Sequence, residues 1–497
     1  MSTWSRYPRW FATLFLTDMW ERFSFYGMQA ILVLYAVTPA EQGGLGLSVQ
    51  TAAALFGAYM ATVFLLAQPG GWIGDRILGE RRAIMYGGCL ITAGHACMAV
   101  PLPGSAYAGL ALIALGTGLL KPSLSALLSR FYGETIRREA AFSIFYMSIQ
   151  VSAVLAPIVT GFLGEYVSWH AGFAAAAVGM AFGLVQFSAG SRHFAGKGER
   201  PAHPATDAEL SVVIRRTAIA AAVVVPLLCV DVVSGAFSIE HVLIALGLVS
   251  LIAPPLCLRA LRRHPQLTAA DRTRLGAVTW LLLCSALFWM VVSQAGSLLN
   301  LFARDHVDRT VLGITMPASW LQSATPLFLI CVAPLFAWLW LRLGDRLGVR
   351  EKFVAGMVFA GSSFGIMYGA ATVAGDGRIS VLWMIAVYFL QACGEIAIGP
   401  VGLSAVADAA PPAFRVRMMG LYWLFVAFGA SLGSIVVRLS AALPQALYYL
   451  LVGVALLVAA GALALLGGRI RRVFATGRDD AYDSTRNVPA SAIHQED

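Results

Sequence analysis

Charge is scarce in this chain, and the scarcity excludes most classes of soluble protein. Only 12% of the 497 residues are charged, 59% are hydrophobic, and the mean hydropathy is +0.75. An average soluble protein is about one quarter charged and about half apolar. The chain is therefore predicted to cross a membrane many times. The net charge of +9 lies in short loops between apolar runs, which indicates membrane topology and not nucleic-acid binding.

Motifs of other functional classes are also missing. The seven cysteines are scattered through apolar runs without CxxC spacing, which indicates neither a metal site nor a disulfide framework. No HExxH motif occurs and the eight histidines are dispersed, so a membrane-embedded enzyme is disfavoured. We therefore expect no catalytic residues, no metal and no cofactor. We also expect no cleavable signal peptide, because the first apolar run is long and contains charges.

Long apolar runs dominate what is present. A helix needs about 20 largely apolar residues to cross a bilayer core of about 30 Å, whereas barrel strands are about ten residues long and alternate in polarity. The predicted fold class is an all-α polytopic membrane protein with fourteen spans. The predicted spans are 10–38, 48–74, 82–102, 106–130, 141–164, 168–190, 213–233, 238–261, 276–303, 317–344, 352–373, 380–408, 414–437 and 444–468.

Polar linkers divide these spans into groups of six, two and six. Two six-helix halves are typical of pseudo-symmetric transporters, which bind their substrate between the halves. The predicted units are an N-terminal six-helix bundle over 1–190, a linker with two extra transmembrane helices over 191–274, a C-terminal six-helix bundle over 275–470 and a disordered cytoplasmic tail over 471–497.

The loops between the spans differ sharply in positive charge. If the N-terminus is cytoplasmic, most of the arginines fall in inside loops, and the outside loops hold only Arg304, Arg309, Arg378 and Arg438. Positive charge accumulates on the cytoplasmic side of membrane proteins. Both termini are therefore predicted to be cytoplasmic.

A charged stripe interrupts the first span, which reads TDMWERFSFYGMQAIL over 17–32. At helical spacing, Asp18, Glu21, Arg22 and Tyr26 share one face. A charge at the bilayer centre costs at least about 2.5–3.5 kcal/mol, so this face is predicted to line a protein or water cavity. Asp18 and Arg22 are expected to pair, because they are four residues apart. The alternative is a buried ion network that only holds the first helix in place.

Two further charges lie near the middle of other spans. Lys121 and Arg22, from the N-terminal half, suit a carboxylate, whereas Glu395, from the C-terminal half, suits an ammonium group. A zwitterion would therefore bridge the halves and favour the closed form. His95, in the third span, is interpreted as a hydrogen-bonded core residue in preference to a proton relay.

The charged segments also resemble a known family. The chain is identified as similar to the proton-dependent oligopeptide transporters (POT/PTR), a branch of the major facilitator superfamily. The resemblance covers nearly all of 10–470. The matching motifs are TDMWERFSFYG (17–27), GGWIGDRILGERRAI (70–84), GTGLLKPSLS (116–125), AAFSIFYMSIQVSAVLAP (140–157), LFWMVVSQAGSLLNLFA (287–303), LQSATPLF (321–328), GEIAIGPVGLS (394–404) and MMGLYW (418–423).

The resemblance implies a fold and an activity. The fold would be the major facilitator fold, with two six-helix bundles, an inserted two-helix hairpin and 14 transmembrane helices in all. The protein would be a proton-coupled symporter that imports di- and tripeptides by alternating access, as a monomer in the bacterial inner membrane. Its partners would be a small peptide substrate, protons and the lipid bilayer, with no nucleic acid.

The resemblance also implies roles for individual residues. Asp75 and Arg76 would act in gating, although they are equally well explained as charges that only set the topology. Proton coupling would involve Asp18, Glu21, Arg22 and Glu395. The substrate-binding residues would be Arg22, Tyr26, Lys121, Gln150, Trp289, Thr325, Glu395, Tyr422 and Trp423.

Departures from the family pattern bear on coupling. The glutamate that the family uses for proton coupling on its seventh helix is Ser293 here, and a hydroxyl cannot take up and release a proton near neutral pH. Coupling is then expected to rest on Asp18, Glu21 and Glu395. The other substituted positions are Asp18, Phe25, Gln29, Phe64, Gln150 and Thr325.

Other activities stay open at this point. The chain is also compatible with a carrier for modified peptides, nitrate or another small anion or zwitterion, with weak or no proton coupling. A receptor or channel, in particular a peptide sensor that does not transport, is the other alternative. Retained peptide transport with altered coupling is favoured, because the losses of one acidic and one basic group, at Ser293 and Gln29, nearly cancel in charge.

Overall fold

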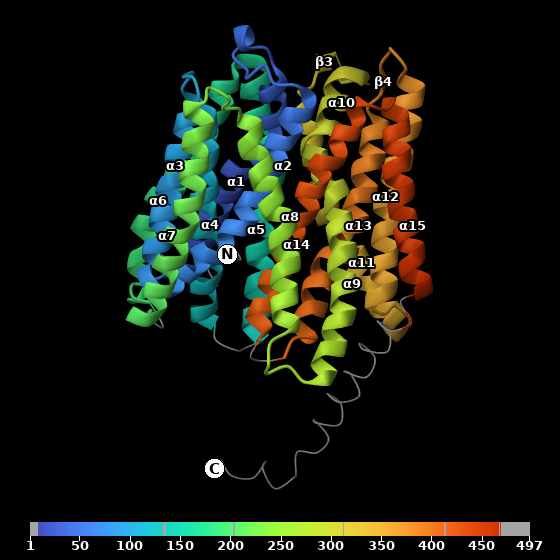
Figure 1. The fold of residues 1–497 in the computed structure, drawn as a ribbon. Helices are drawn as coiled ribbons and strands as arrows, with labels where there is room; N and C mark the ends of the chain where they lie inside the picture. The colour runs from blue at the N-terminus through green and yellow to red at the C-terminus, as the bar shows by residue number, and fades with distance from the viewer. Residues whose placement is uncertain are drawn as a thin grey trace.

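Long helices lying side by side make up this protein (Figure 1). The structure, a computed structural model, describes residues 8–132, 136–201, 204–311, 313–411, 414–466 and 468. The tail predicted over 471–497 lies outside the described residues. The helices of the first half are α1 (Arg9–Val37), α2 (Val49–Ile73), α3 (Glu80–Ala99), α4 (Ser105–Tyr132), α5 (Ile136–Phe162) and α6 (Trp169–Gly190).

The rest of the chain is also mostly helical and includes four short strands among its described residues. Short strands pair β1 (Val307–Asp308) with β4 (Ile379–Ser380) in parallel and β2 (Thr310–Val311) with β3 (Ile314–Thr315) in antiparallel orientation. The helices are α7 (Asp207–Val233), α8 (Ile239–Arg262), α9 (Ala269–Val292), α10 (Leu298–His306), α11 (Ala324–Leu343), α12 (Val349–Ala374), α13 (Leu382–Asp408), α14 (Arg415–Val437) and α15 (Gln445–Leu466).

Most of these helices are suited to a bilayer. Within the described residues, 12 helical segments are long and apolar enough to cross a membrane. The helix α1 does not belong to this set because its polar stripe lowers its hydropathy. The prediction of an all-α polytopic membrane protein is confirmed.

One predicted span differs in detail from the structure. The stretch 276–303 was expected as one helix, but the 3₁₀ segment η6 (Ser293–Gly296) separates α9 from α10. A Cβ atom on Gly296 would lie 2.4 Å from the Phe56 ring, so the chain at the break approaches α2 too closely for any side chain. Ser293, which stands where the family has a glutamate, is the C-terminal cap residue of α9.

Close helix packing in the first half depends on small residues. A Cβ atom on Gly87 of α3 would lie 2.7 Å from the Gly116 carbonyl oxygen of α4, and one on Gly94 would lie 2.6 Å from the Gly109 carbonyl oxygen. Small residues let membrane helices approach until their backbones touch. His95 lies beside this contact, fully buried, and neither ring nitrogen has a hydrogen-bond partner among the described residues. The expectation that His95 is hydrogen-bonded is therefore wrong.

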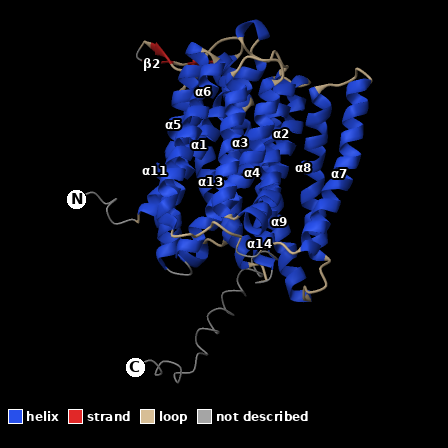
Figure 2. Ribbon diagram, turned by 90° about the vertical axis from the view of Figure 1, so that its left-hand side faces the viewer, coloured by secondary structure: helices blue, strands red, loops and turns tan. Residues whose placement is uncertain are grey.

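The inserted helices α7 and α8 lie at one edge of the molecule (Figure 2). The helix α8 contacts α2 of the first half and α14 of the second half. By contrast, α7 buries none of its described side chains. The hairpin is therefore attached to the bundles through α8.

Candidate functional site

The charged stripe of α1 faces the interior of the protein. Asp18 and Glu21 have 0% exposure and Arg22 has 8%, because α1 packs between α5 and α6 and also contacts α4. The prediction that these charges avoid lipid is confirmed. Buried charges are costly unless each is paired, so their partners decide how the site works.

Arg22 pairs with its neighbour Glu21. Its Nε and Nη2 atoms donate to the two carboxylate oxygens of Glu21, each at 2.5 Å. This two-point geometry matches the planar fork of a guanidinium group and is stronger than a single contact. Arg22 also lies over the ring of Phe25, 4.5 Å from its centroid, and 5.9 Å from the Tyr26 ring centroid.

Asp18 reaches across to two other helices. Its Oδ1 atom accepts from the Lys121 ammonium of α4 at 2.5 Å, and its Oδ2 atom accepts from the Ser148 hydroxyl of α5 at 2.7 Å. Both carboxylate oxygens are thus satisfied by residues far away in sequence. The predicted pairing of Asp18 with Arg22 is therefore wrong, because each of the two residues has a better-oriented partner.

The four charges form one cluster whose formal sum is zero. The ammonium of Lys121 lies within electrostatic reach of Arg22 as well as of both carboxylates. Some 28% of the Lys121 side chain is exposed, so the cluster borders open space on one side. Each of the two cations in the cluster is held by one carboxylate.

Glu395 of α13 lies on the opposite side of the same region. It is half-buried, and no basic side chain among the described residues pairs with it. The hydroxyl of Tyr26, on α1, lies within electrostatic reach of both Arg22 and Glu395. Tyr146 of α5 lies within reach of both Tyr26 and Glu395. Two tyrosines of the N-terminal half therefore lie within reach of Glu395 of the C-terminal half.

Two residues of α5 at this site were not among the predicted ones. Tyr146 hydrogen-bonds with the predicted Gln150, and Ser148 holds Asp18. Both lie in the segment FYMSIQ, within a motif that the sequence had already marked. This motif could have indicated both residues. The direction in which each side chain points, however, follows only from the packing of α5 on α1.

The predicted aromatic residues separate into two places. Tyr422 of α14 is buried within electrostatic reach of Glu395, and its hydroxyl donates to the Gly399 carbonyl oxygen at 3.3 Å. Trp423 points elsewhere and stacks on Phe64 of α2, with ring centroids 5.7 Å apart and an angle of 7° between the planes. Trp289 of α9 is half-buried, packs against Phe288 of the same helix and lies within hydrogen-bonding reach of Tyr422. Of these rings, the contacts place Tyr422 beside Glu395.

Thr325 lies in the first turn of α11, half-buried. The hydroxyl of Ser323, just before it, donates to the Val154 carbonyl oxygen of α5 at 2.7 Å. Thr325 is therefore close to the contact between α11 and α5, where the two halves meet. None of the hydrogen bonds given for the described residues links Thr325 to the charged cluster.

The predicted gating residues Asp75 and Arg76 lie in the π-helical segment η3 (Gly74–Leu78), which directly follows α2. They are neighbours whose charged atoms are 3.8 Å apart. Arg76 also lies 3.6 Å from the Glu209 carboxylate of α7, and its carbonyl oxygen accepts from the Ala205 amide at 2.9 Å. Arg76 thus connects the first half to the linker that leads into the inserted hairpin.

The two halves are joined at the upper end of Figure 1, where β3 and β4 lie. Glu165, in the π-helical segment η4 (Leu163–Val167), accepts from the backbone amides of Ala318 and Ser319 at 2.8 and 3.0 Å and from the Ser319 hydroxyl at 2.6 Å. Arg309 lies 3.7 Å from the same carboxylate. A half-buried acidic side chain of one half is therefore held by three donors and a cation of the other.

Further hydrogen bonds extend this closure toward the middle. The side-chain amides of Asn300 and Gln322 both donate to the Ala30 carbonyl oxygen, at 2.8 and 3.0 Å. The indole N–H of Trp320 donates to the Ile158 carbonyl oxygen at 2.9 Å. These bonds add three further contacts between the first and second halves.

Comparisons with known proteins indicate the family of this chain. The family model described as "POT family" matches residues 81–451. The "Uncharacterized transporter YclF" of Bacillus subtilis (strain 168) is 34% identical over 470 residues, which cover 94% of this chain and 95% of the relative. A di-/tripeptide transporter of Lactococcus lactis subsp. cremoris is 35% identical over 429 residues, which cover 84% of this chain and 86% of the relative.

A solved structure is similar over the same extent. The crystal structure of a peptide transporter POT in complex with sulfate has a TM-score of 0.90 and 38% sequence identity, and the match covers 94% of this chain and 96% of that one. The predicted major facilitator fold, with its two bundles and inserted hairpin, is thereby confirmed. On the family match and on the length and identity of these similarities, the chain belongs to the POT family.

Proposed function

We propose that the protein is a proton-coupled symporter that imports di- and tripeptides by alternating access. The observation that carries this proposal is that Tyr26 lies within electrostatic reach of both Arg22 of one half and Glu395 of the other. Peptides carry a carboxylate and an ammonium group at opposite ends, and these two residues offer matching charges. The naming of a relative as a di-/tripeptide transporter supports the same substrate class.

The proposed binding mode uses both halves. The peptide carboxylate binds Arg22 and Lys121, and its ammonium group binds Glu395, with Tyr26 and Gln150 lining the space between them. A ligand with contacts to both halves favours the state in which the halves approach each other. Tyr422 lines the space beside Glu395, and Trp289 and Thr325 complete the walls. Trp423 has the weakest support, because it stacks on Phe64.

Proton coupling is proposed to act through the ion pairs of α1. Glu21 and Asp18 hold the two cations that a peptide carboxylate needs. A proton on Glu21 breaks its bidentate pair and frees Arg22 for substrate, whereas an unprotonated Glu21 competes with the substrate. Ser293 donates to the Met290 carbonyl oxygen at 3.2 Å and serves as a helix cap in this scheme.

The proposed orientation places the lower end of Figure 1 in the cytoplasm of a bacterial inner membrane. The connection from α8 to α9 lies at this end, with Arg262 and Arg263 where α8 ends, and positive charge concentrates on the cytoplasmic side. Both termini are then cytoplasmic. The hydrogen bonds around Glu165 close the opposite, external face, so this structure corresponds to the inward-facing state. The chain acts as a monomer in this proposal.

The test is uptake of a labelled dipeptide into proteoliposomes, with and without an imposed pH gradient. Glu395→Gln removes the charge that binds the ammonium group, a loss of about 1.5–3 kcal/mol, which corresponds to roughly ten- to hundredfold in affinity. Glu41→Gln is the matched control, because Glu41 is exposed at the upper end. Dipeptide uptake by Glu395→Gln at the rate of the control would contradict the binding mode.

The same vesicles separate the carrier from a sensor and test the coupling. Uptake of the wild type that ignores both the gradient and an uncoupler would remove the proton from the mechanism. Dipeptide binding without any accumulation inside the vesicles would instead show a sensor. Ser293→Glu restores an acidic group at the end of α9, and we expect it to increase the gradient dependence of uptake.

A further inference from the structure

We propose that the lower end of α8 forms a binding site for an anionic phospholipid, with its phosphate on a group of arginines and an acyl chain in the cleft beside them. The cleft lies between α8, α9 and α14 and has a volume of about 410 Å³, within the range of about 300–1,000 Å³ that is usual for small-molecule sites. It is open on one side.

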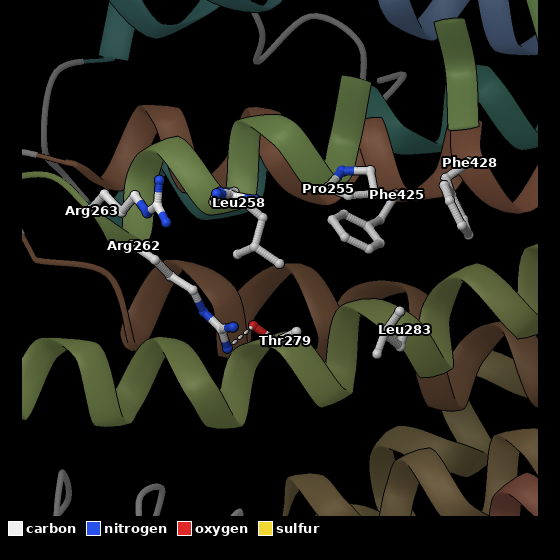
Figure 3. A pocket seen from close by; sticks show the side chains of 9 residues that line it. Pro255, Leu258, Arg262, Arg263, Thr279, Leu283, Phe425 and Phe428 are labelled. Carbon is white, nitrogen blue, oxygen red and sulfur yellow. Dashed lines mark hydrogen bonds between the residues drawn. The ribbon is translucent and has the colours of Figure 1, made fainter. Parts of the chain in front are cut away.

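The upper part of the cleft is apolar. Leu258 of α8 and Phe425 of α14 are buried at its floor, and Leu283 of α9 forms its exposed wall. Figure 3 shows Leu258, Phe425 and Leu283 directed toward the space between α8 and α9. These helices belong to the membrane-spanning set, so an occupant of this part must be soluble in lipid. An acyl chain meets that condition.

The lower part of the cleft is strongly basic. Arg259, Arg262 and Arg263 line it, and none of the described residues that line it is acidic. Arg262 donates to the Thr279 hydroxyl of α9 at 2.9 Å, and this bond bridges the cleft (Figure 3). Arg259 and Arg263 are exposed, and neither forms a salt bridge with another described residue. Three unneutralised cations at the end of a membrane helix call for an anionic partner.

The apolar and basic parts of the cleft together indicate which class of lipid binds there. A guanidinium group matches the oxygens of a phosphate with two parallel hydrogen bonds, and basic pockets between membrane helices bind anionic headgroups. A zwitterionic lipid would place its own ammonium group against the arginines, so phosphatidylglycerol or cardiolipin fits and phosphatidylcholine does not. Bound lipid would hold α8 against α9 and α14 of the C-terminal half. This site is separate from the charged cluster of α1, so the inference does not depend on the transport proposal.

Native mass spectrometry of the full chain in detergent tests the proposal, with phosphatidylglycerol, cardiolipin and phosphatidylcholine as probes. The site variant is Arg259→Gln with Arg263→Gln, which keeps the bond from Arg262 to Thr279. The matched control is Arg215→Gln with Arg216→Gln, since these two arginines are exposed on α7. We expect the site variant to bind phosphatidylglycerol about thirtyfold more weakly, because each arginine near an anionic lipid surface contributes a factor of about five.

A second variant tests the apolar part without altering charge. Leu283→Trp fills the cleft, and we expect it to lower lipid occupancy as well, whereas the control keeps that of the wild type. Equal affinity for phosphatidylcholine, or unchanged phosphatidylglycerol binding in both site variants, would overturn the proposal. Displacement of the lipid by inorganic phosphate at the same concentration would also overturn it, because the site would then recognise only a free anion.

Discussion

At the scale of single residues, the central finding is which carboxylate holds which cation. Arg22 is paired with Glu21 and Lys121 with Asp18, and all four lie together in the interior of the N-terminal half. Removing one partner of a buried pair leaves an uncompensated charge, which costs more than removing both. The pairing can therefore be tested by comparing the stability of a variant that lacks one partner with that of a variant that lacks both.

Lys121→Met is expected to lower stability by about 3–5 kcal/mol, because Asp18 stays charged in the interior with only the Ser148 hydroxyl to hold it. The double variant Asp18→Asn with Lys121→Met removes both charges and should recover most of that loss. The measurement is the thermal unfolding midpoint in detergent. Arg215→Met, on an exposed arginine of α7, is the control and should change the midpoint little. Equal midpoints for the single and double variants would show that the pair does not exist.

Glu21→Gln should uncouple uptake from the proton gradient. A glutamine cannot form the charged two-point contact, so Arg22 is available to the substrate carboxylate whatever the pH. Exchange of labelled for unlabelled dipeptide across the vesicle membrane should persist, while gradient-driven accumulation should fall several-fold.

Glu41→Gln provides the comparison for that experiment, because it removes the same charge from an exposed site. Persistent exchange shows that the variant is folded. Accumulation by Glu21→Gln that matches Glu41→Gln would move coupling to another carboxylate.

The sequence predicted these residues better than it predicted their partners. The helical spacing of Asp18, Glu21 and Arg22 was sufficient to show that they share one buried face. The pairing was not predictable, because Asp18 binds Lys121 and Ser148, which lie 103 and 130 residues away in the sequence. Such contacts follow from how α4 and α5 pack against α1, and local spacing carries no information about that.

At the scale of elements, the contact between α3 and α4 depends on the absence of side chains. Gly94→Ala would place a methyl group 2.6 Å from the Gly109 carbonyl oxygen, so the helices must separate. Overpacking of this kind costs about 1–3 kcal/mol, and the thermal midpoint should fall. Gly247→Ala on α8 is the matched control, because no atom lies within 4 Å of its added methyl group. A midpoint for Gly94→Ala equal to that of Gly247→Ala would show that α3 and α4 tolerate separation.

The break between α9 and α10 marks the limit of prediction from hydropathy. The residues of 276–303 are mostly apolar and carry no charge, so a sliding window sees one continuous span. The interruption at Ser293–Gly296 depends on the approach of Gly296 to Phe56 of the other half. A contact between halves therefore sets the shape of an element that looks uniform in sequence.

At the scale of the whole molecule, the proposed alternating access makes the contacts at the upper end decide which face is open. Glu165→Gln should weaken that closure, because its carboxylate accepts three hydrogen bonds from Ala318 and Ser319. Hydrogen bonds to a charged group contribute about 1.5–3 kcal/mol each, so losing even one shifts the equilibrium about tenfold or more toward the outward-open state.

Spin labels at positions 41 and 376, on opposite halves at the upper end, would report this change as a longer distance between them. Glu240→Gln, at the upper end of α8, is the comparison. A distance distribution in Glu165→Gln identical to that in Glu240→Gln would show that closure depends on other contacts.

The sequence indicated two halves and a site between them, but not the residues that close the upper end. Glu165, Asn300, Trp320 and Gln322 lie near helix ends, where a polar residue is unremarkable. Their function as a closure depends on a surface of one half meeting a surface of the other. Only the relative placement of the halves reveals it.

The exposed helix α7 has a practical consequence. It buries no described side chain, and a Cβ atom added at Gly235, in the turn that leads to α8, would meet no atom within 4 Å. A fluorophore or an affinity tag inserted at that turn would leave the transport cycle undisturbed. If the lower end is cytoplasmic, this turn lies on the external side of the membrane. Impermeant reagents added to intact spheroplasts would then reach the tag, so it could be used to label the protein or to attach it to a surface.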